Sequence, residues 1–374
     1  MGIIFCALFF LAGCSTAPPQ FPLDWPDTNA VVIPVVIQTN KPVAVLTNKP
    51  AIPTVKSNPP PAIVSKPAPA APVAAWTSLE SWAEEHKIGR PHRISDSPAT
   101  TYAIGSGYGV MVLGIGSLEA TWNGIEINLG FAPEFIDGEI FLNELDLQKN
   151  LEPLLCEPLL TFPKTNRVIV IDPGHGGSNH GTYARSVQDG PFEKEFTLDW
   201  AKRLKPLLEA EGWKVFLTRT SDVYVTNADR VVFAEAHRAD VFISLHFNST
   251  NQDKKTSKRN EKAGGLETYC ITPTGMPSTL TRDFGDNWSD ILPNNAFDAR
   301  NFQLAVQVHG ALLHAVGMED HGVRRSRFDT VLRGQNRPAI LIEGGYLSNP
   351  AEAKLIETPE YRQKLAEGVA EALK

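Results

Sequence analysis

The sequence predicts an α/β fold, in which a twisted and mostly parallel sheet is flanked by helices. Three short runs at 168–171, 241–245 and 339–342 are almost wholly apolar, as expected for parallel strands that are covered on both faces. Segments 196–208 and 304–316 repeat apolar residues at helical spacing between these runs. Ahead of this α/β part, we expect a small β-rich domain and a disordered Pro-rich linker.

The α/β part is expected to span residues 165–374. Apolar residues recur on one face of helix 196–208, and helix 304–316 ends at Gly317, a residue type that favours helix C-termini. The remaining elements are expected in chain order as a strand at 214–218, a helix at 228–236, a strand at 266–269 and an amphipathic helix at 361–373.

Residues 76–160 are expected to form the small β-rich domain. A short helix is predicted at 79–85, and the pairs Asn123-Gly124 and Asp137-Gly138 are typical of two-residue hairpin turns between short strands. The segment holds no cluster of candidate catalytic groups. Its role as a binding module or as a purely structural one is open at this point.

The N-terminal residues are expected to be an export signal and a linker. Residues 15–75 are rich in Pro, Ala and Lys, a composition that favours extended chain and cannot build a core. The apolar run at 3–11 is too short to span a membrane. It leads into Leu11-Ala12-Gly13-Cys14, and residues 1–14 therefore resemble the signal of a bacterial lipoprotein, although Met1-Gly2 carries no positive charge.

That resemblance implies cleavage before Cys14, a lipid on its thiol and, with Ser15 next, attachment to the outer membrane on the periplasmic side. The alternative is an ordinary secretory signal in which Cys14 is incidental. The net charge of −7 argues against a nucleic-acid partner, because phosphate binding needs a clustered positive surface. Cys156 and Cys270 could pair in an oxidising compartment or remain free thiols.

Polar groups able to do chemistry stand at the ends of three predicted strands. The first strand leads into Asp172-Pro173-Gly174-His175, the second contains His246, and the last ends in Glu343. Ligands in open α/β sheets bind at the carboxyl ends of the strands, so these groups are expected to converge. Glu193, at the start of the following helix, is expected at the same end. Two imidazoles with carboxylates indicate a metal site.

The stretch 167–374 resembles the zinc-dependent N-acetylmuramoyl-L-alanine amidases of family 3, which cut peptidoglycan during cell separation. Six motifs carry the resemblance and occur in family order. They are Ile171-Asp172-Pro173-Gly174-His175-Gly176-Gly177, Glu193-Lys194, Leu217-Thr218-Arg219 with Ser221-Asp222, Ile243-Ser244-Leu245-His246 with Asn248, Gly322-Val323-Arg324-Arg325, and Ile340-Leu341-Ile342-Glu343 with Leu347-Ser348-Asn349-Pro350.

The resemblance implies that His175, Glu193 and His246 bind one Zn²⁺ and that Glu343 is the catalytic carboxylate. Such a three-ligand site leaves a position for water, as in hydrolytic zinc enzymes. His180 and Glu195 remain rival ligands, because the loop after His175 departs from the usual pattern. Asn248 could orient a ligand or bind substrate.

The sequence predicts the roles of the other candidate residues less specifically. Arg219, Asp222 and Arg230 are expected to form a structural ion-pair and capping network. The histidines at 86, 237, 309 and 314 are expected to be surface or packing residues, and a substrate-facing role is open for His321. Gly344-Gly345-Tyr346 departs from the bulkier residue and aromatic usual after the catalytic carboxylate, which predicts an altered pocket shape.

Two rival functions remain, a zinc peptidase or deacetylase and a non-catalytic wall-binding lipoprotein. The resemblance also implies peptidoglycan as partner and a regulatory protein as a further one. Some family members carry an inhibitory helix over the zinc site. The prolines between Cys270 and Arg300 predict at most a short lid here.

Overall fold

The structure is a computed structural model that describes residues 75–184, 191–250, 260–280, 286–327 and 330–374. The predicted signal at 1–14 and nearly all of the linker at 15–75 lie outside these residues. None of the described helices has both the length and the apolar character that a membrane span requires. Residues 67–374 cluster as one compact unit.

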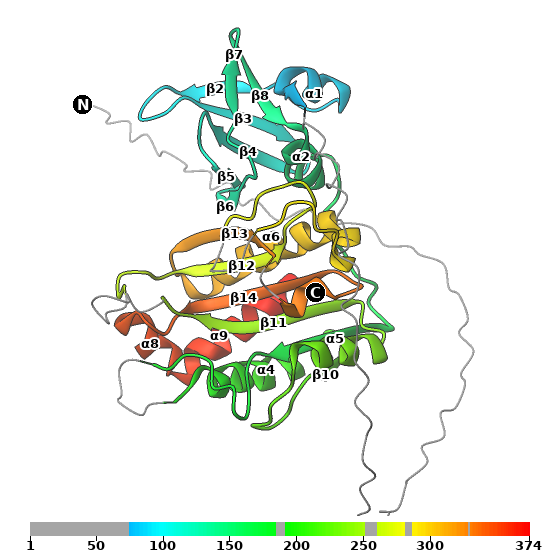
Figure 1. Cartoon of the computed structure of the whole chain (residues 1–374), viewed down its shortest axis with the longest axis vertical. Helices are drawn as coiled ribbons and strands as arrows, with labels where there is room; N and C mark the ends of the chain where they lie inside the picture. The colour runs from blue at the N-terminus through cyan, green and yellow to red at the C-terminus, as the bar shows by residue number, and fades with distance from the viewer. Residues whose placement is uncertain (1–74, 185–190, 251–259, 281–285, 328–329) are drawn as a thin grey trace, which may run out of the picture. The chain divides into compact units, whose positions relative to one another are not determined.

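The first half of the described chain is mostly short strands (Figure 1). Its elements are β1 (Trp76–Ser78), α1 (Leu79–Glu85), β2 (His92–Ser95), β3 (Thr101–Ser106), β4 (Gly109–Gly114), β5 (Glu119–Trp122), β6 (Ile125–Asn128), β7 (Glu134–Ile136), β8 (Glu139–Asn143), α2 (Glu144–Asp146), the π-helix η1 (Leu147–Leu151) and α3 (Glu152–Leu155).

Both predicted hairpin turns are present. Asn123 and Gly124 have φ values of 51° and 82° between the paired residues Trp122 and Ile125. Asp137 and Gly138 have φ values of 51° and 94° between β7 and β8. Left-handed backbone at both turn positions is what a type I′ turn requires, and Asn-Gly and Asp-Gly tolerate it best.

The second half alternates strands and helices. Its elements are β9 (Arg167–Pro173), α4 (Glu193–Ala210), β10 (Trp213–Leu217), α5 (Asn227–Ala236), β11 (Val241–Asn248), β12 (Leu266–Ile271), the 3₁₀-helix η2 (Pro293–Phe297), α6 (Asp298–Val316), β13 (Asp320–Ser326), α7 (Thr330–Arg333), β14 (Ala339–Tyr346), α8 (Pro350–Ile356) and α9 (Pro359–Ala372).

One mixed sheet of eleven strands runs in the order β10-β9-β11-β14-β12-β13-β6-β5-β4-β3-β2. Strands β10, β9, β11 and β14 are parallel to their neighbours in that series, β12 is antiparallel to β14, and β13 is parallel to β12. Val323 of β13 pairs with Ile127 of β6, so the sheet crosses the boundary predicted at 160–165. Strands β1, β8 and β7 form a separate three-stranded sheet.

Apolar residues alternate between two cores on the faces of the α/β sheet. Ile169, Ile171 and Ile243 share one buried cluster with residues of α4, α6 and α9. Val170 and Phe242 are the residues next to these in their strands, and they belong to the second buried cluster, together with residues of α5 and α7. Successive side chains of a strand point to opposite faces, so both faces of these strands are buried, as their sequence predicts.

Candidate metal centre

His175 lies two residues after β9, in a loop held by glycines and hydrogen bonds. The backbone of His175 is left-handed, with φ 61°, and Gly176 and Gly177 follow at φ 128° and 57°. Arg230 donates to the His175 carbonyl at 2.7 Å. The ring Nδ1 lies 2.9 Å from the amide oxygen of Asn179, an acceptor. With the proton on Nδ1, the Nε2 lone pair is available to a metal ion.

Glu193 is the first residue of α4, and its carboxylate lies between two imidazoles. Its Oε1 is 3.0 Å from Nε2 of His175 and 3.0 Å from Nδ1 of His246. Oε1 also accepts a hydrogen bond from the Phe247 backbone at 3.1 Å, and Oε2 accepts one from Thr182 at 3.0 Å. The carboxylate is therefore fixed from four sides.

Electrostatics favours opposite charges within this group. Burial raises the pKa of Glu193, but hydrogen bonds from both imidazoles and their charges outweigh it and hold that pKa well below its ordinary value. Burial lowers the pKa of His175, but the hydrogen bond and charge of Glu193 raise it overall. A carboxylate so strongly biased toward its ionised form suits a cation between the rings.

His246 comes from β11, and Glu343 stands beside it on β14. The two residues are partners in the parallel pairing of these strands, so their side chains leave the same face of the sheet. The ring centroids of His246 and His175 are 4.8 Å apart. Glu343 is 7% exposed. The structure thus brings all four predicted residues to the carboxyl end of the parallel strands.

A buried polar network holds the loop of His175. Asp172 accepts hydrogen bonds from Thr218 and Arg230, and from Ser244 at 2.8 Å. Arg219 donates to the carbonyls of Pro173 and Gly174 at 2.9 and 2.8 Å. These hydrogen bonds end on β9 and on the loop that follows it. Arg219 and Arg230 therefore hold the backbone of the His175 loop in place.

Asp222, the third member predicted for this network, lies at its exposed edge. Its carboxylate accepts from the Gly177 backbone and from Lys194, both at 2.7 Å. Lys194 also donates to the Gly177 carbonyl at 3.0 Å. The residue after Glu193 therefore ties the start of α4 to the glycine loop.

The two rival ligands lie outside the group. Glu195 is exposed, one residue past Lys194. The ring of His180 is exposed and packs against Phe192, with centroids 4.5 Å apart. Neither belongs to the set of His175, Glu193 and His246, whose potential ligand atoms all lie within 4.8 Å of one another.

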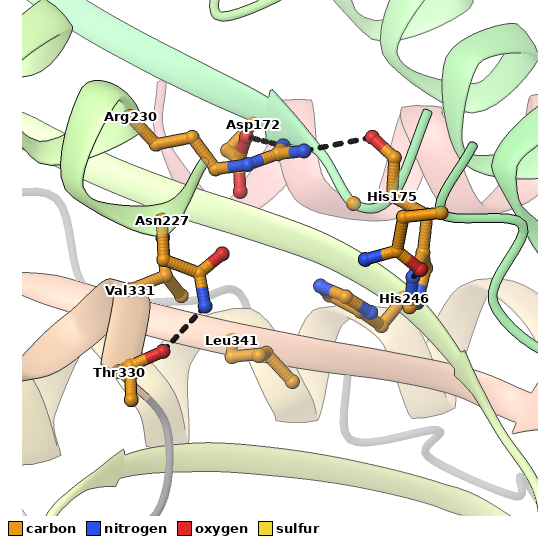
Figure 2. Close-up of a pocket in the computed structure, with 10 residues that line it drawn as sticks. Asp172, His175, Asn227, Arg230, His246, Thr330, Val331 and Leu341 are labelled. Carbon is orange, nitrogen blue, oxygen red and sulfur yellow. Dashed lines mark hydrogen bonds and ion pairs between the residues drawn. The ribbon is translucent and has the colours of Figure 1, made fainter. Parts of the chain in front are cut away.

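A pocket opens beside the two imidazoles (Figure 2). His175 and His246 lie on one side of it, and Asn227 and Thr330, which are hydrogen-bonded to each other, lie on the other. The remaining lining residues are Asp172, Gly174, Asn179, Arg230, Val331 and Leu341. Asn227 was not a sequence candidate; it is the first residue of α5, and Thr226 before it caps the helix by accepting a hydrogen bond from the Asp229 backbone at 3.1 Å.

The site also holds a buried carboxylate that the sequence interpretation missed. Glu267 of β12 pairs with Glu343 of β14 and accepts hydrogen bonds from Asn248, Tyr269 and Tyr346 at 2.6, 2.9 and 3.0 Å. Asn248 therefore bonds a carboxylate rather than the His–Glu–His group. An acidic residue inside an otherwise apolar strand was the available signal, because burying it requires partners.

Several other sequence candidates are structural. His309 is fully buried on α6, where its ring nitrogens pair with Thr268 and Asp320 at 2.9 and 3.0 Å. Cys156 and Cys270 are free thiols. Within the described parts of 271–300, helical structure before α6 is limited to the five residues of η2.

The donor set fits zinc. Two imidazole nitrogens and one carboxylate oxygen are the ligand types of hydrolytic zinc sites. The 3.0 Å separations around Glu193 Oε1 are near the roughly 3.4 Å between ligands of a tetrahedral ion with bonds of about 2.1 Å. Gly174 leaves room beside His246, because a Cβ on that glycine would lie 2.3 Å from the ring Cε1.

Comparison with known proteins places this α/β part in a family. Residues 169–374 match the Amidase_3 family, described as N-acetylmuramoyl-L-alanine amidase. Since the match covers more than half of the chain and contains the whole His–Glu–His group, the protein belongs to this family.

Individual relatives have similar descriptions. The chain is 31% identical over 242 residues to the N-acetylmuramoyl-L-alanine amidase AmiC of Neisseria meningitidis serogroup B, covering 61% of this chain and 56% of the relative. It is 34% identical over 212 residues to the probable cell wall amidase LytH of Staphylococcus saprophyticus, covering 57% and 59%. The chain thus spans less than two thirds of the length of these relatives.

Similar solved structures include an N-acetylmuramoyl-L-alanine amidase of Clostridium difficile 630. It is 30% identical, the match covers 55% of this chain and 94% of that one, and the TM-score is 0.43. The catalytic domain of CwlV from Bacillus (Paenibacillus) polymyxa var. colistinus is 28% identical, with coverage of 55% and 95% and a TM-score of 0.43.

Proposed function

We propose that this protein is a zinc-dependent hydrolase of the amide bond between N-acetylmuramic acid and L-alanine in peptidoglycan, acting in cell-wall remodelling or cell separation. The observation that carries the proposal is the His–Glu–His group, which lies inside the part of the chain that matches the amidase family. The family match supports the substrate, and the donor set supports the metal.

His175, Glu193 and His246 would hold the ion, beside the pocket that His175 and His246 line. When bound, zinc supplies a Lewis acid that polarises the scissile carbonyl and makes water more acidic. The chain prepares these ligands before the ion binds. Asn179 orients the ring of His175, while the Phe247 and Thr182 backbones orient the carboxylate of Glu193.

Glu343 would be the general base and then the general acid. Its place beside His246 in the strand pairing, on the same face of the sheet, supports this role. In this role Glu343 would accept a proton from the attacking water and return it to the leaving nitrogen of L-alanine. The buried Asp172 network keeps the loop of His175 in position and takes no part in the proton transfer.

Digestion of purified peptidoglycan tests the reaction. The amidase leaves free lactyl groups on the glycan and intact stem peptides, which mass spectrometry identifies. Cleaved peptides would instead indicate a peptidase, and free sugar amines a deacetylase. Binding to peptidoglycan without any product would indicate the non-catalytic wall-binding protein.

Glu343→Gln tests the assigned base. This variant is expected to lose about 10²- to 10⁴-fold in kcat, because proton transfer is removed while the three zinc ligands remain. Zinc content, measured by atomic emission on the same preparation, should stay near that of the unaltered chain. His175→Ala is the matched comparison, and it should lose both zinc and activity. Full activity of Glu343→Gln would contradict the mechanism.

We further propose that the chain is a lipoprotein at the periplasmic side of the outer membrane, anchored through Cys14 and regulated by a partner protein. The segment 11–14 supports the anchor. Labelled palmitate supplied to expressing cells should enter the full chain and not its Cys14→Ala variant. Equal labelling of both would refute the anchor, and secretion without any label would indicate an ordinary signal.

A further inference from the structure

A row of polar side chains continues from the metal centre across the sheet. His246 of β11 pairs with Glu343 of β14, and Glu343 pairs in turn with Glu267 of β12. Paired residues on neighbouring strands project from the same face. Neighbouring strands are about 4.8 Å apart, so Glu267 lies about 10 Å from His246 along this face.

Arg324 of β13 stands at the far end of the row. It pairs with Tyr269 of β12, while the next residue, Arg325, lies over the ring of Phe302 on the α6 side of the sheet. Alternation therefore directs Arg324 to the face that carries Glu267 and Glu343. Its Nε lies 3.5 Å from Oε1 of Glu267 and donates to the His321 carbonyl at 2.8 Å.

The Glu267 carboxylate is a fixed support for this arginine. It is 2% exposed and is held by Asn248, Tyr269 and Tyr346, so it cannot follow a ligand. A buried carboxylate needs a compensating cation, and Arg324 is the nearest guanidinium. Nδ1 of His321 lies 3.9 Å from the same oxygen.

The guanidinium retains binding capacity on its outer edge. Both contacts with Glu267 and His321 are made by Nε, and among the described residues the two terminal nitrogens make no hydrogen bond or ion pair. The side chain is 23% exposed. Two parallel N–H groups in a fixed plane form the geometry that binds a carboxylate in a bidentate manner.

We propose that Arg324 binds a carboxylate on the peptide side of the scissile amide and that Glu267 is its positioning residue. The inference rests on the proposed amidase function and assigns the subsite for the stem peptide. Arg324 Nε lies 3.5 Å from the Glu267 carboxylate, whose strand is about 10 Å from that of His246. Two extended residues span about 7 Å and the long side chain of Arg324 covers the remainder, so a carboxylate on the second residue from the scissile bond comes within reach of the guanidinium. Arg324 therefore selects stem peptides with a free carboxylate at that residue.

A pair of muropeptides tests the proposal. One carries glutamate as the second residue of the stem, and the other carries isoglutamine, in which an amide replaces the α-carboxylate. The zinc-loaded chain is expected to favour the glutamate form by about tenfold or more in kcat/KM, chiefly through KM, as a charge-assisted hydrogen-bonded pair warrants. Arg324→Gln should bring the ratio near one, chiefly by raising KM for the glutamate form.

Arg324→Lys and Arg300→Gln serve as comparisons. Lysine keeps the charge without the planar fork and should retain part of the preference. Arg300 is exposed on α6, so its variant should behave as the unaltered chain. Calorimetric titration with L-alanyl-D-glutamate and its isoglutamine counterpart should show the same order of binding.

The outcomes separate the subsite from the function. Equal kcat/KM for both muropeptides in the unaltered chain, or a preference that Arg324→Gln leaves intact, overturns the subsite. A stronger preference for glutamate after Arg324→Gln also overturns it. Failure of the unaltered, zinc-loaded chain to cut either muropeptide or peptidoglycan instead overturns the proposed function.

Discussion

At the scale of single residues, the metal centre depends on glycines as much as on its ligand side chains. The loop that carries His175 passes so close to His246 that only hydrogen fits at Gly174. Gly344, next to Glu343, is equally enclosed, since a Cβ there would lie 2.9 Å from Trp200 and 3.0 Å from Phe247. The small residue after Glu343 therefore reflects packing beneath the strand.

Gly174→Ala is expected to weaken zinc binding by about tenfold or more, because the new methyl group must displace an imidazole whose placement sets metal affinity. Competition with a chromophoric chelator measures the affinity. Gly107→Ala is the matched control, since nothing lies within 4 Å of a Cβ at that position. Unchanged zinc affinity in Gly174→Ala would show that the ring of His246 moves without cost.

The meeting of His175, Glu193 and His246 could be predicted from sequence, whereas the meeting of Glu267 with Arg324 could not. His175, His246 and Glu343 each follow or end an apolar strand, and strand ends converge by a general rule. Glu267 and Arg324 lie on β12 and β13, and their meeting depends on which strands are neighbours. Strand order comes from tertiary pairing, which no local pattern of this chain reveals.

At the scale of elements, the strands and helices that could be predicted are those whose own residues show apolar runs or apolar residues at helical spacing. Strands β9, β11 and β14 are apolar on both sides, and helix α4 extends the predicted 196–208 by a few residues. Helix α6 begins six residues earlier than predicted, at Asp298. Its first turns carry buried polar residues such as Gln303, which donates to the carbonyls of Pro153 and Pro158.

Four elements of the second half, η2, β13, α7 and α8, were not predicted, and β13 and α8 show two different reasons. Strand β13 is highly polar, and Arg325 is buried there only because Asn150, Lys149 and Phe302 from other elements surround it. Helix α8 did have a local signal, since Asn349 caps it and Pro350 occupies its first position. Capping residues therefore deserve the same weight as apolar spacing in a helix of seven residues.

At the scale of the whole molecule, the carboxylate of Asp320 is one of the links between the β-rich strands and the α/β part. Asp320, at the start of β13, accepts hydrogen bonds from the Glu126 backbone of β6 at 2.9 Å and from the Gly322 backbone at 2.8 Å, and it pairs with His309 of α6 at 3.0 Å. Burial raises the pKa of Asp320, but these hydrogen bonds outweigh it and lower the pKa overall.

The direction of that shift predicts how acid affects the junction. A carboxyl group whose pKa is lower in the folded state stabilises the fold above its unfolded pKa, and this contribution is lost as the pH falls through the folded pKa. Asp320→Asn should therefore lower the free energy of unfolding at pH 7 by about 1 kcal/mol, as expected for a partly exposed hydrogen-bonded charge. The deficit should shrink as the pH falls below about 4.

Glu126 must be removed from this comparison, because burial raises its pKa and the charge of Asp320 raises it further. Its raised pKa gives the opposite trend, a loss of stability as the pH rises through it. The measurement is urea unfolding of Glu126→Gln against Glu126→Gln/Asp320→Asn from pH 3 to 7. A stability difference that stays constant across this range would show that the Asp320 charge plays no part in joining the two parts of the sheet.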